Sequence, residues 1–121
     1  MIVEARAALE TLFDEGGFNV SAFVPERVTP PLAIITPAGD WVASGDVFGA
    51  FRLGFDVTLV TPTASNAKVT DELDQMVDDA IALVTGAQGF YCGSVNSPEL
   101  LAVQNAEFLS VSMTVYQNTS L

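Results

Sequence analysis

The sequence predicts an α+β fold in which two helices pack on one face of a mostly antiparallel sheet. Two segments repeat apolar residues at three- and four-residue steps, two others alternate apolar with polar residues, and glycine- or proline-rich stretches separate them. A chain of 121 residues is the usual size of one domain, so residues 1–121 are expected to share a single core. The expected order is helix, three strands, helix and two strands.

The N-terminal third is predicted to hold the first helix and two strands. From Ile2 to Phe13 the apolar side chains gather on one helical face, and Gly16-Gly17 is expected to end the helix. The segment Phe18–Val24 mixes aromatic, β-branched and polar residues, which is typical of a short strand. Leu32–Thr36 is a continuous apolar run and is predicted to be the second strand.

The clearest strand follows a predicted turn and hairpin. Pro37–Asp40 has the composition of a turn, and Trp41–Ala50 is interpreted as a long hairpin or ordered loop. Within Phe51–Val60 the residues alternate strictly, which gives one apolar and one polar face. The apolar positions are Phe51, Leu53, Phe55, Val57 and Leu59.

The second helix is predicted over Ala67–Val84, where one apolar stripe runs along the segment. Gly86 is expected to end this helix, Phe90–Val95 to form a strand, and Phe108–Tyr116 to form a final amphipathic strand. Five acids lie away from the stripe, namely Asp71, Glu72, Asp74, Asp78 and Asp79.

One face of the sheet is expected to remain free of helices. Both helices need an apolar surface to cover, so they are expected on the same side of the sheet. The other face is then polar and nearly uncharged, which suits a partner. Its expected residues are Arg52, Asp56, Thr58, Ser110, Ser112 and Thr114.

Composition and charge restrict the possible partners. Hydrophobic residues make up 50% of the chain and charged residues only 16%, so some apolar surface is expected to contact a partner. A formal charge of −11 disfavours direct binding to nucleic acid. The apolar runs are too short for a membrane span, and the charges at Glu4, Arg6 and Glu10 do not fit an export signal. We therefore expect a soluble protein that stays where it is made.

The chain lacks the residues of common catalytic and metal sites. It has no histidine and one cysteine, Cys92, which excludes histidine-based triads, histidine zinc sites and thiolate clusters. The glycines match no nucleotide-binding pattern. Asp74 and Asp78, one helical turn apart, suit a divalent cation, but a solvated helix face is the simpler interpretation. We expect no enzyme activity, no cofactor and no metal, and a buried, inert Cys92 thiol.

Candidate interface residues come from the hairpin, the polar face and the proline-rich connection. Aromatic side chains in a glycine-containing hairpin are costly to expose, so they either mark a partner site or pack into the chain's own core. Both interpretations stay open at this point. The candidates are Trp41, Phe48, Arg52, Asp56 and Arg27.

An ordered set of features extends over nearly the whole chain. The first helix ends in Gly-Gly, and Val24-Pro25-Glu26-Arg27-Val28-Thr29-Pro30-Pro31 leads into an apolar strand. The central strand enters a Thr-Pro-Thr-Ala-Ser-Asn turn, and the helix Val69–Val84 precedes a final strand rich in serine and threonine. In this order the chain resembles the tail terminator (tail-completion) proteins of long-tailed phages that infect actinobacteria.

The resemblance implies a virion structural protein that forms a ring, usually of six copies. Such a ring caps the tail tube, ends its polymerisation and joins the tail to the head–tail connector. The implied partners are further copies of the chain, the tail tube protein and a connector or stopper protein, and DNA passes through without specific binding. The implied location is the tail or neck of the virion, after synthesis in the host cytoplasm. The charge of −11 per copy agrees with this role, because a negative wall does not hold DNA.

Three other interpretations remain open. In these interpretations the chain is another neck subunit (a head-closure or connector protein), a module that binds a small molecule or peptide, or an enzyme that uses carboxylates alone. A binding module should contain a deep pocket within one subunit, and an enzyme should have acids converging in that pocket. A terminator should carry its functional surface between copies.

Overall fold

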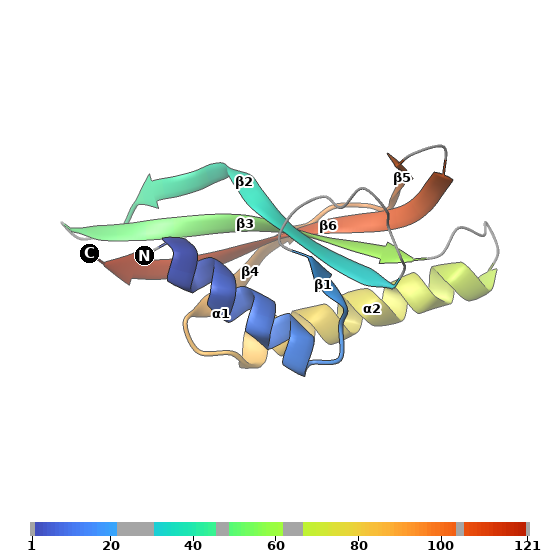
Figure 1. Ribbon diagram of the computed structural model, residues 1–121, viewed down its shortest axis with the longest axis horizontal. Coiled ribbons are helices and arrows are strands. Elements are labelled where there is room, and N and C mark those ends of the chain that lie inside the picture. Colours follow the sequence, from blue (N-terminus) through green and yellow to red (C-terminus); the bar gives the residue numbers. More distant parts are fainter. Residues whose placement is uncertain (1, 22–30, 46–48, 62–66, 104–105, 121) are drawn as a thin grey trace.

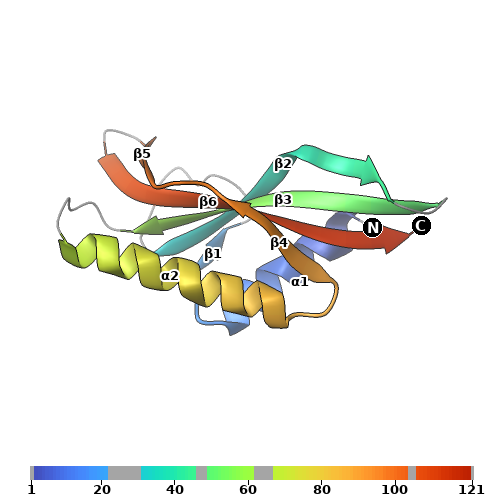
Figure 2. The same cartoon turned by 180° about the vertical axis from the view of Figure 1, so that it is seen from behind.

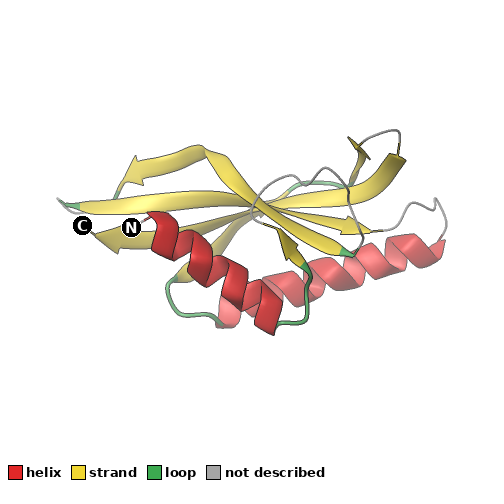
Figure 3. Ribbon diagram, in the orientation of Figure 1, coloured by secondary structure: helices red, strands yellow, loops and turns green. Residues whose placement is uncertain are grey.

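The computed structural model describes residues 2–21, 31–45, 49–61, 67–103 and 106–120. Two helices lie on one side of a six-stranded, mostly antiparallel sheet, as Figures 1 and 3 show, which confirms the predicted α+β class. The expected order of elements is also confirmed, with one short strand, β5, added near the end. The elements are α1 (Ile2–Glu15), β1 (Val20–Ser21), β2 (Leu32–Ser44), β3 (Ala50–Thr61), α2 (Ala67–Gly86), β4 (Phe90–Val95), β5 (Glu99–Val103) and β6 (Ala106–Ser120).

The sheet is built around the pairing of β3 with β6. Its strand order is β1-β2-β3-β6-β4, and β5 pairs with one end of β6. The two central strands pair without interruption from Ala50 opposite Ser120 to Thr61 opposite Leu109. All pairs are antiparallel except β1 with β2, which is parallel and spans only two residues of each strand.

The main core fills the space between the helices and the sheet, on the side we call the helix face. Figure 2, seen from behind, again has both helices on this side. The predicted alternation in β3 is confirmed for Leu53, Phe55, Val57 and Leu59, which are fully buried. The helices and the other strands contribute Ala5, Leu9, Phe13, Ala33, Ile35, Ala80, Val84, Met113 and Val115.

The first helix ends at the predicted glycine pair. The Phe18 N–H donates to the Phe13 carbonyl at 3.0 Å, and Gly17 between them has a φ of 94°. This left-handed conformation favours glycine and satisfies a carbonyl of the last turn. The chain then reverses into β1. The predicted strand over Phe18–Val24 is realised only at Val20–Ser21, and residues 22–24 lie outside the described residues.

The turn predicted at Pro37–Asp40 is wrong. Strand β2 continues through these residues, and they instead interrupt its pairing with β3, because the register shifts between Pro37 and Val42. Figure 1 shows the resulting bend in β2. Pro37 cannot donate a backbone hydrogen bond, but among the described residues no strand lies on the outer side of this part of β2, and proline is tolerated at such an edge.

The sheet face opposite the helices, which we call the open face, is only partly polar. At one end, Leu32, Ile34 and Val60 form a second apolar cluster, against which Leu101 and Phe108 pack. Ser110, predicted on a polar face that suits a partner, is 2% exposed and donates to the Glu99 carbonyl at 3.3 Å. The prediction of a uniformly polar face is therefore wrong at this end, because the β5–β6 hairpin covers it.

Candidate functional site

The five predicted interface residues do not form one cluster. Arg52 and Asp56 lie on the open face of β3, whereas Trp41 lies in β2 beside Arg6 of α1, on the helix face. Arg27 and Phe48 lie outside the described residues. The described candidates are therefore divided between the open face of β3 and the outer edge of the sheet at β2.

Arg52 has its partners within its own chain. One guanidinium nitrogen is 3.5 Å from an Asp40 carboxylate oxygen, and the guanidinium carbon lies 4.5 Å from the centroid of the Tyr116 ring. The centroid of the Tyr116 ring also lies 5.4 Å from the centroid of the Tyr91 ring on β4. Arginine and tyrosine are enriched in the energetically dominant parts of protein interfaces. We call Asp40, Arg52, Tyr91 and Tyr116 the open-face cluster.

Two glycines make room for the Tyr116 ring. Gly54 is paired directly with Tyr116, and a Cβ atom at Gly54 would lie 3.2 Å from the ring and 2.6 Å from the Asp40 carbonyl oxygen. A Cβ atom at Gly93 of β4 would also collide with the ring. At Gly54 and Gly93 the Tyr116 ring therefore packs directly against the backbone of the neighbouring strands.

Hydroxyl groups in the middle of the open face form hydrogen bonds across β3 and β6. The Thr58 and Ser112 hydroxyls lie 3.2 Å apart across β3 and β6. The Thr114 hydroxyl donates to an Asp56 carboxylate oxygen at 3.4 Å. Asp56 therefore has a hydrogen-bond partner within its own chain.

Sequence reasoning missed three members of the open-face cluster. Tyr116 continues the alternation of Ser110, Ser112 and Thr114, so its place on this face was available from the pattern. Tyr91 and Asp40 gave no such signal, because their positions depend on the pairing of β4 with β6 and on the bend in β2.

Exposed apolar side chains lie on both outer edges of the sheet, in addition to Val3 of α1 and Leu100 of β5. Strand β1 covers only the first residues of β2, so the outer side of Pro37–Ser44 has no neighbouring strand among the described residues. Trp41 and Val42 there are 38% and 40% exposed. On the opposite edge, Tyr91 and Val95 of β4 are 40% and 37% exposed. Unpaired edges with apolar side chains favour association.

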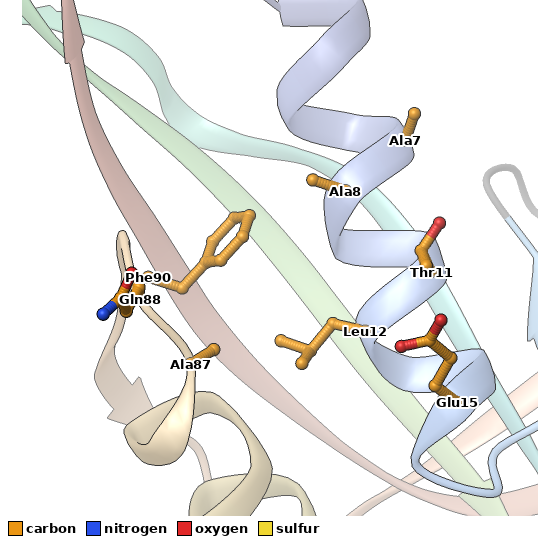
Figure 4. Close-up of a pocket in the computed structure, with 8 residues that line it drawn as sticks. All are labelled: Ala7, Ala8, Thr11, Leu12, Glu15, Ala87, Gln88 and Phe90. Atoms are coloured by element: carbon orange, nitrogen blue, oxygen red, sulfur yellow. The ribbon is translucent and has the colours of Figure 1, made fainter.

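A pocket of about 400 Å³ lies between α1 and the connection from α2 to β4. Figure 4 shows Ala8 and Leu12 of α1 pointing toward the Phe90 ring across this space. The lining is mostly apolar, and its single ionisable group is Glu15. The remaining lining residues are Ala7, Thr11, Ala87 and Gln88.

The acids of α2 behave as a solvated helix face. Asp71, Glu72, Asp74, Asp78 and Asp79 are all exposed, as predicted. Asp74 and Asp78 border a second hollow, between α2 and the end of β4. Within the described ranges, no group of three or more cysteine or acidic side chains is placed so that it could hold a metal ion.

Cys92 is half-buried rather than fully buried as predicted. It lies on β4 and packs against the main core. Burial raises the pKa of its thiol, because the thiolate is less stable away from water. The thiol is therefore less reactive at neutral pH than an exposed cysteine.

Comparisons of the sequence with protein-family models and with curated proteins find no match. Neither of the described helices is long and apolar enough to cross a membrane.

Proposed function

We propose that this chain is a virion structural protein whose copies form a ring, usually six in the family it resembles, on the end of a phage tail tube. The ring caps the tube, ends its polymerisation and joins the tail to the head–tail connector. The observation that supports this proposal best is the presence of exposed apolar side chains on both outer edges of one sheet.

The two edges favour head-to-tail contacts between copies. Trp41 and Val42 lie on one edge, Tyr91 and Val95 lie on the other, and the two edges have different sequences. Contact between unlike surfaces is heterologous, and repeated heterologous contacts generate closed rings when the rotation allows. A two-fold dimer would instead pair one edge with the same edge of the other copy.

The charge distribution supports a channel that DNA can pass. The chain carries fifteen acidic and four basic residues. The exposed side of α2 alone has five acids, which gives the ring an extended negative surface. Such a surface repels the phosphate backbone and does not retain DNA.

The test is to add the purified protein to polymerising tail-tube protein from the same genome and to image the products by negative stain. We expect tubes of limited length with a ring on one end, and native mass spectrometry of detached caps should give a closed oligomer. Tubes of unchanged length without rings would contradict the proposal. Rings found only on head connectors would assign the chain to the neck instead.

A further inference from the structure

We propose that Trp41 of one copy packs into the pocket between α1 and β4 of the next copy. This inference rests on the proposed ring, because it identifies the two surfaces that join neighbours. The pocket is the one lined by Ala8, Leu12 and Phe90. Each copy then contributes one tryptophan and one pocket, and the contact repeats around the ring.

Trp41 and one wall of the pocket lie at the same level of the sheet, on opposite outer strands, because Phe90 of β4 belongs to that wall whereas α1 forms the other wall. Val42, next to Trp41, is paired with Leu53 of β3, and Leu53 is paired with Gln117 of β6. Gln117 is in turn paired with Phe90 of β4, whose ring borders the pocket. One cross-strand row therefore runs from the edge beside Trp41 to Phe90, in one wall of the pocket. A neighbour placed beside the sheet, without sliding along the strands, brings Trp41 to the level of Phe90, on the β4 side of the pocket.

Both features also lie on the same side of the sheet. The guanidinium carbon of Arg6, on α1, is 5.9 Å from the centroid of the Trp41 ring, so this ring lies on the helix face. The pocket is formed by α1 and the start of β4, also on the helix face (Figure 4). A neighbour related by a small rotation therefore needs no inversion to bring the two together.

The chemistry of the two surfaces is complementary. Trp41 is partly exposed and large, and tryptophan is the residue type most enriched among interface anchors. The pocket has small alanine side chains and apolar Leu12 and Phe90 at its walls. Arg6 lies over the tryptophan and Glu15 lines the pocket, so these two side chains have opposite charges, while Asp40 beside Trp41 is paired with Arg52 of its own chain.

Strand direction agrees with the same arrangement. Strands β2, β3, β6 and β4 alternate in direction, so β4 of one copy would run antiparallel to β2 of the next. Pro37 lacks a backbone donor, and β2 bends where its register with β3 shifts, so the outer edge of β2 is not a straight, continuous ladder of donors and acceptors. Side chains, rather than a continuous backbone ladder, must therefore supply most of the contact.

Cysteine cross-linking tests this contact while keeping Trp41 in place. In a Cys92→Ser background, Val42→Cys and Gln88→Cys put one thiol beside the tryptophan and one at the pocket of the same chain. We expect oxidation to give a ladder of disulfide-linked species that ends at the closed ring, both in concentrated solution and on tail tubes. The matched control carries Val42→Cys with Val3→Cys, because Val3 is exposed on α1 and does not line the pocket.

Two further variants separate contact from folding. Trp41→Ala removes the anchor, and Ala8→Trp fills the pocket, and each should abolish all species above the background of the control pair. Thermal melts of both variants verify that the subunit stays folded. A ladder that is missing, or that survives both changes in folded protein, would overturn the inference. If wild-type protein caps tubes but no ladder forms, only this contact is wrong. If the ladder forms but wild-type protein does not cap tubes, only the proposed function is wrong.

Discussion

The guanidinium of Arg52 lies over the ring of Tyr116, with 4.5 Å between the guanidinium carbon and the ring centroid. The two residues occupy neighbouring strands in diagonal positions, because Tyr116 is paired with Gly54 and Arg52 with Asn118. Asp40, from the bend in β2, approaches the same guanidinium. Asp40, Arg52 and Tyr116 connect three strands on the open face, and substitutions can measure what each contact contributes.

Arg52→Gln should lower the free energy of unfolding by about 1 kcal/mol, because it removes both the contact with the ring and the ion pair. Asp40→Asn removes only the ion pair, and Asp40 is 75% exposed, so its effect should be smaller. Urea unfolding at low and high salt measures both. The effect of Asp40→Asn should vanish in high salt, where exposed charges are screened. Equal effects of the two changes would indicate that the ring contributes nothing.

Gly54→Ala should destabilise the protein by about 1–3 kcal/mol, a typical cost of overpacking. The new methyl group would lie 2.6 Å from the Asp40 carbonyl oxygen, which belongs to backbone and cannot rotate away. Gly39→Ala is the matched control, because a methyl group there meets nothing within 4 Å. Thermal melts compare the two variants. A neutral Gly54→Ala would mean that the bend in β2 does not lie over Gly54.

Alkylation of Cys92 should be slower in the native protein than in urea, and its pH profile should lie at higher pH. The reason is that burial raises the pKa of the folded-state thiol. The unfolded chain then loses this proton at lower pH than the folded chain. The difference between the two pKa values of the thiol therefore leaves the free energy of unfolding unchanged while the pH is below the unfolded-state pKa. The free energy of unfolding declines as the pH rises from the unfolded-state pKa toward the folded-state pKa.

The control for the cysteine prediction is Cys92→Ala. This variant should lose the part of the alkaline decline in stability that the thiol causes. Iodoacetamide labelling followed by mass spectrometry gives the rates, and urea unfolding at a series of pH values gives the stability. Identical labelling profiles in native and unfolded protein would refute the assigned burial effect.

Periodicity revealed those elements whose burial follows a regular spacing. The alternation around Phe55 and the helical stripe ending at Val84 each belong to one segment, so a single stretch of sequence contains the whole signal. The bend at Pro37–Asp40 has the composition of a turn but lies within an edge strand. Composition alone cannot distinguish these two outcomes, because both tolerate proline and glycine.

Features that depend on strand pairing were not available from the sequence. Tyr91 and Tyr116 contact each other only because β4 pairs with β6. In the sheet β6 lies between β3 and β4, although it comes last in the chain. The level of Trp41 relative to the α1–β4 pocket likewise depends on three successive registers. Trp41 was identified as a candidate from its residue type and setting, but its complement could be found only from the fold.

The two faces of β3 should respond in opposite ways to an added carboxylate. Phe55 is fully buried in the main core, so Phe55→Asp would place an unpaired charge there and remove a large apolar side chain. Loss of a buried phenylalanine alone typically costs about 3–5 kcal/mol, and burial of a charge adds to this, so the variant should not fold. Position 52 lies on the open face, where the side chain of Arg52 is 34% exposed. Arg52→Glu should therefore fold, with modest destabilisation.

Circular dichroism and thermal melts of the two variants decide whether β3 has this orientation. Arg52→Glu should keep a cooperative melt at a lower midpoint, because its carboxylate faces Asp40 and can no longer bind over the Tyr116 ring. Phe55→Ala serves as the control that separates loss of packing from burial of charge. It should be less damaging than Phe55→Asp, because alanine leaves a cavity but no unpaired carboxylate. A cooperative melt for Phe55→Asp near that of the wild type would place Phe55 outside the core and contradict the orientation of the strand.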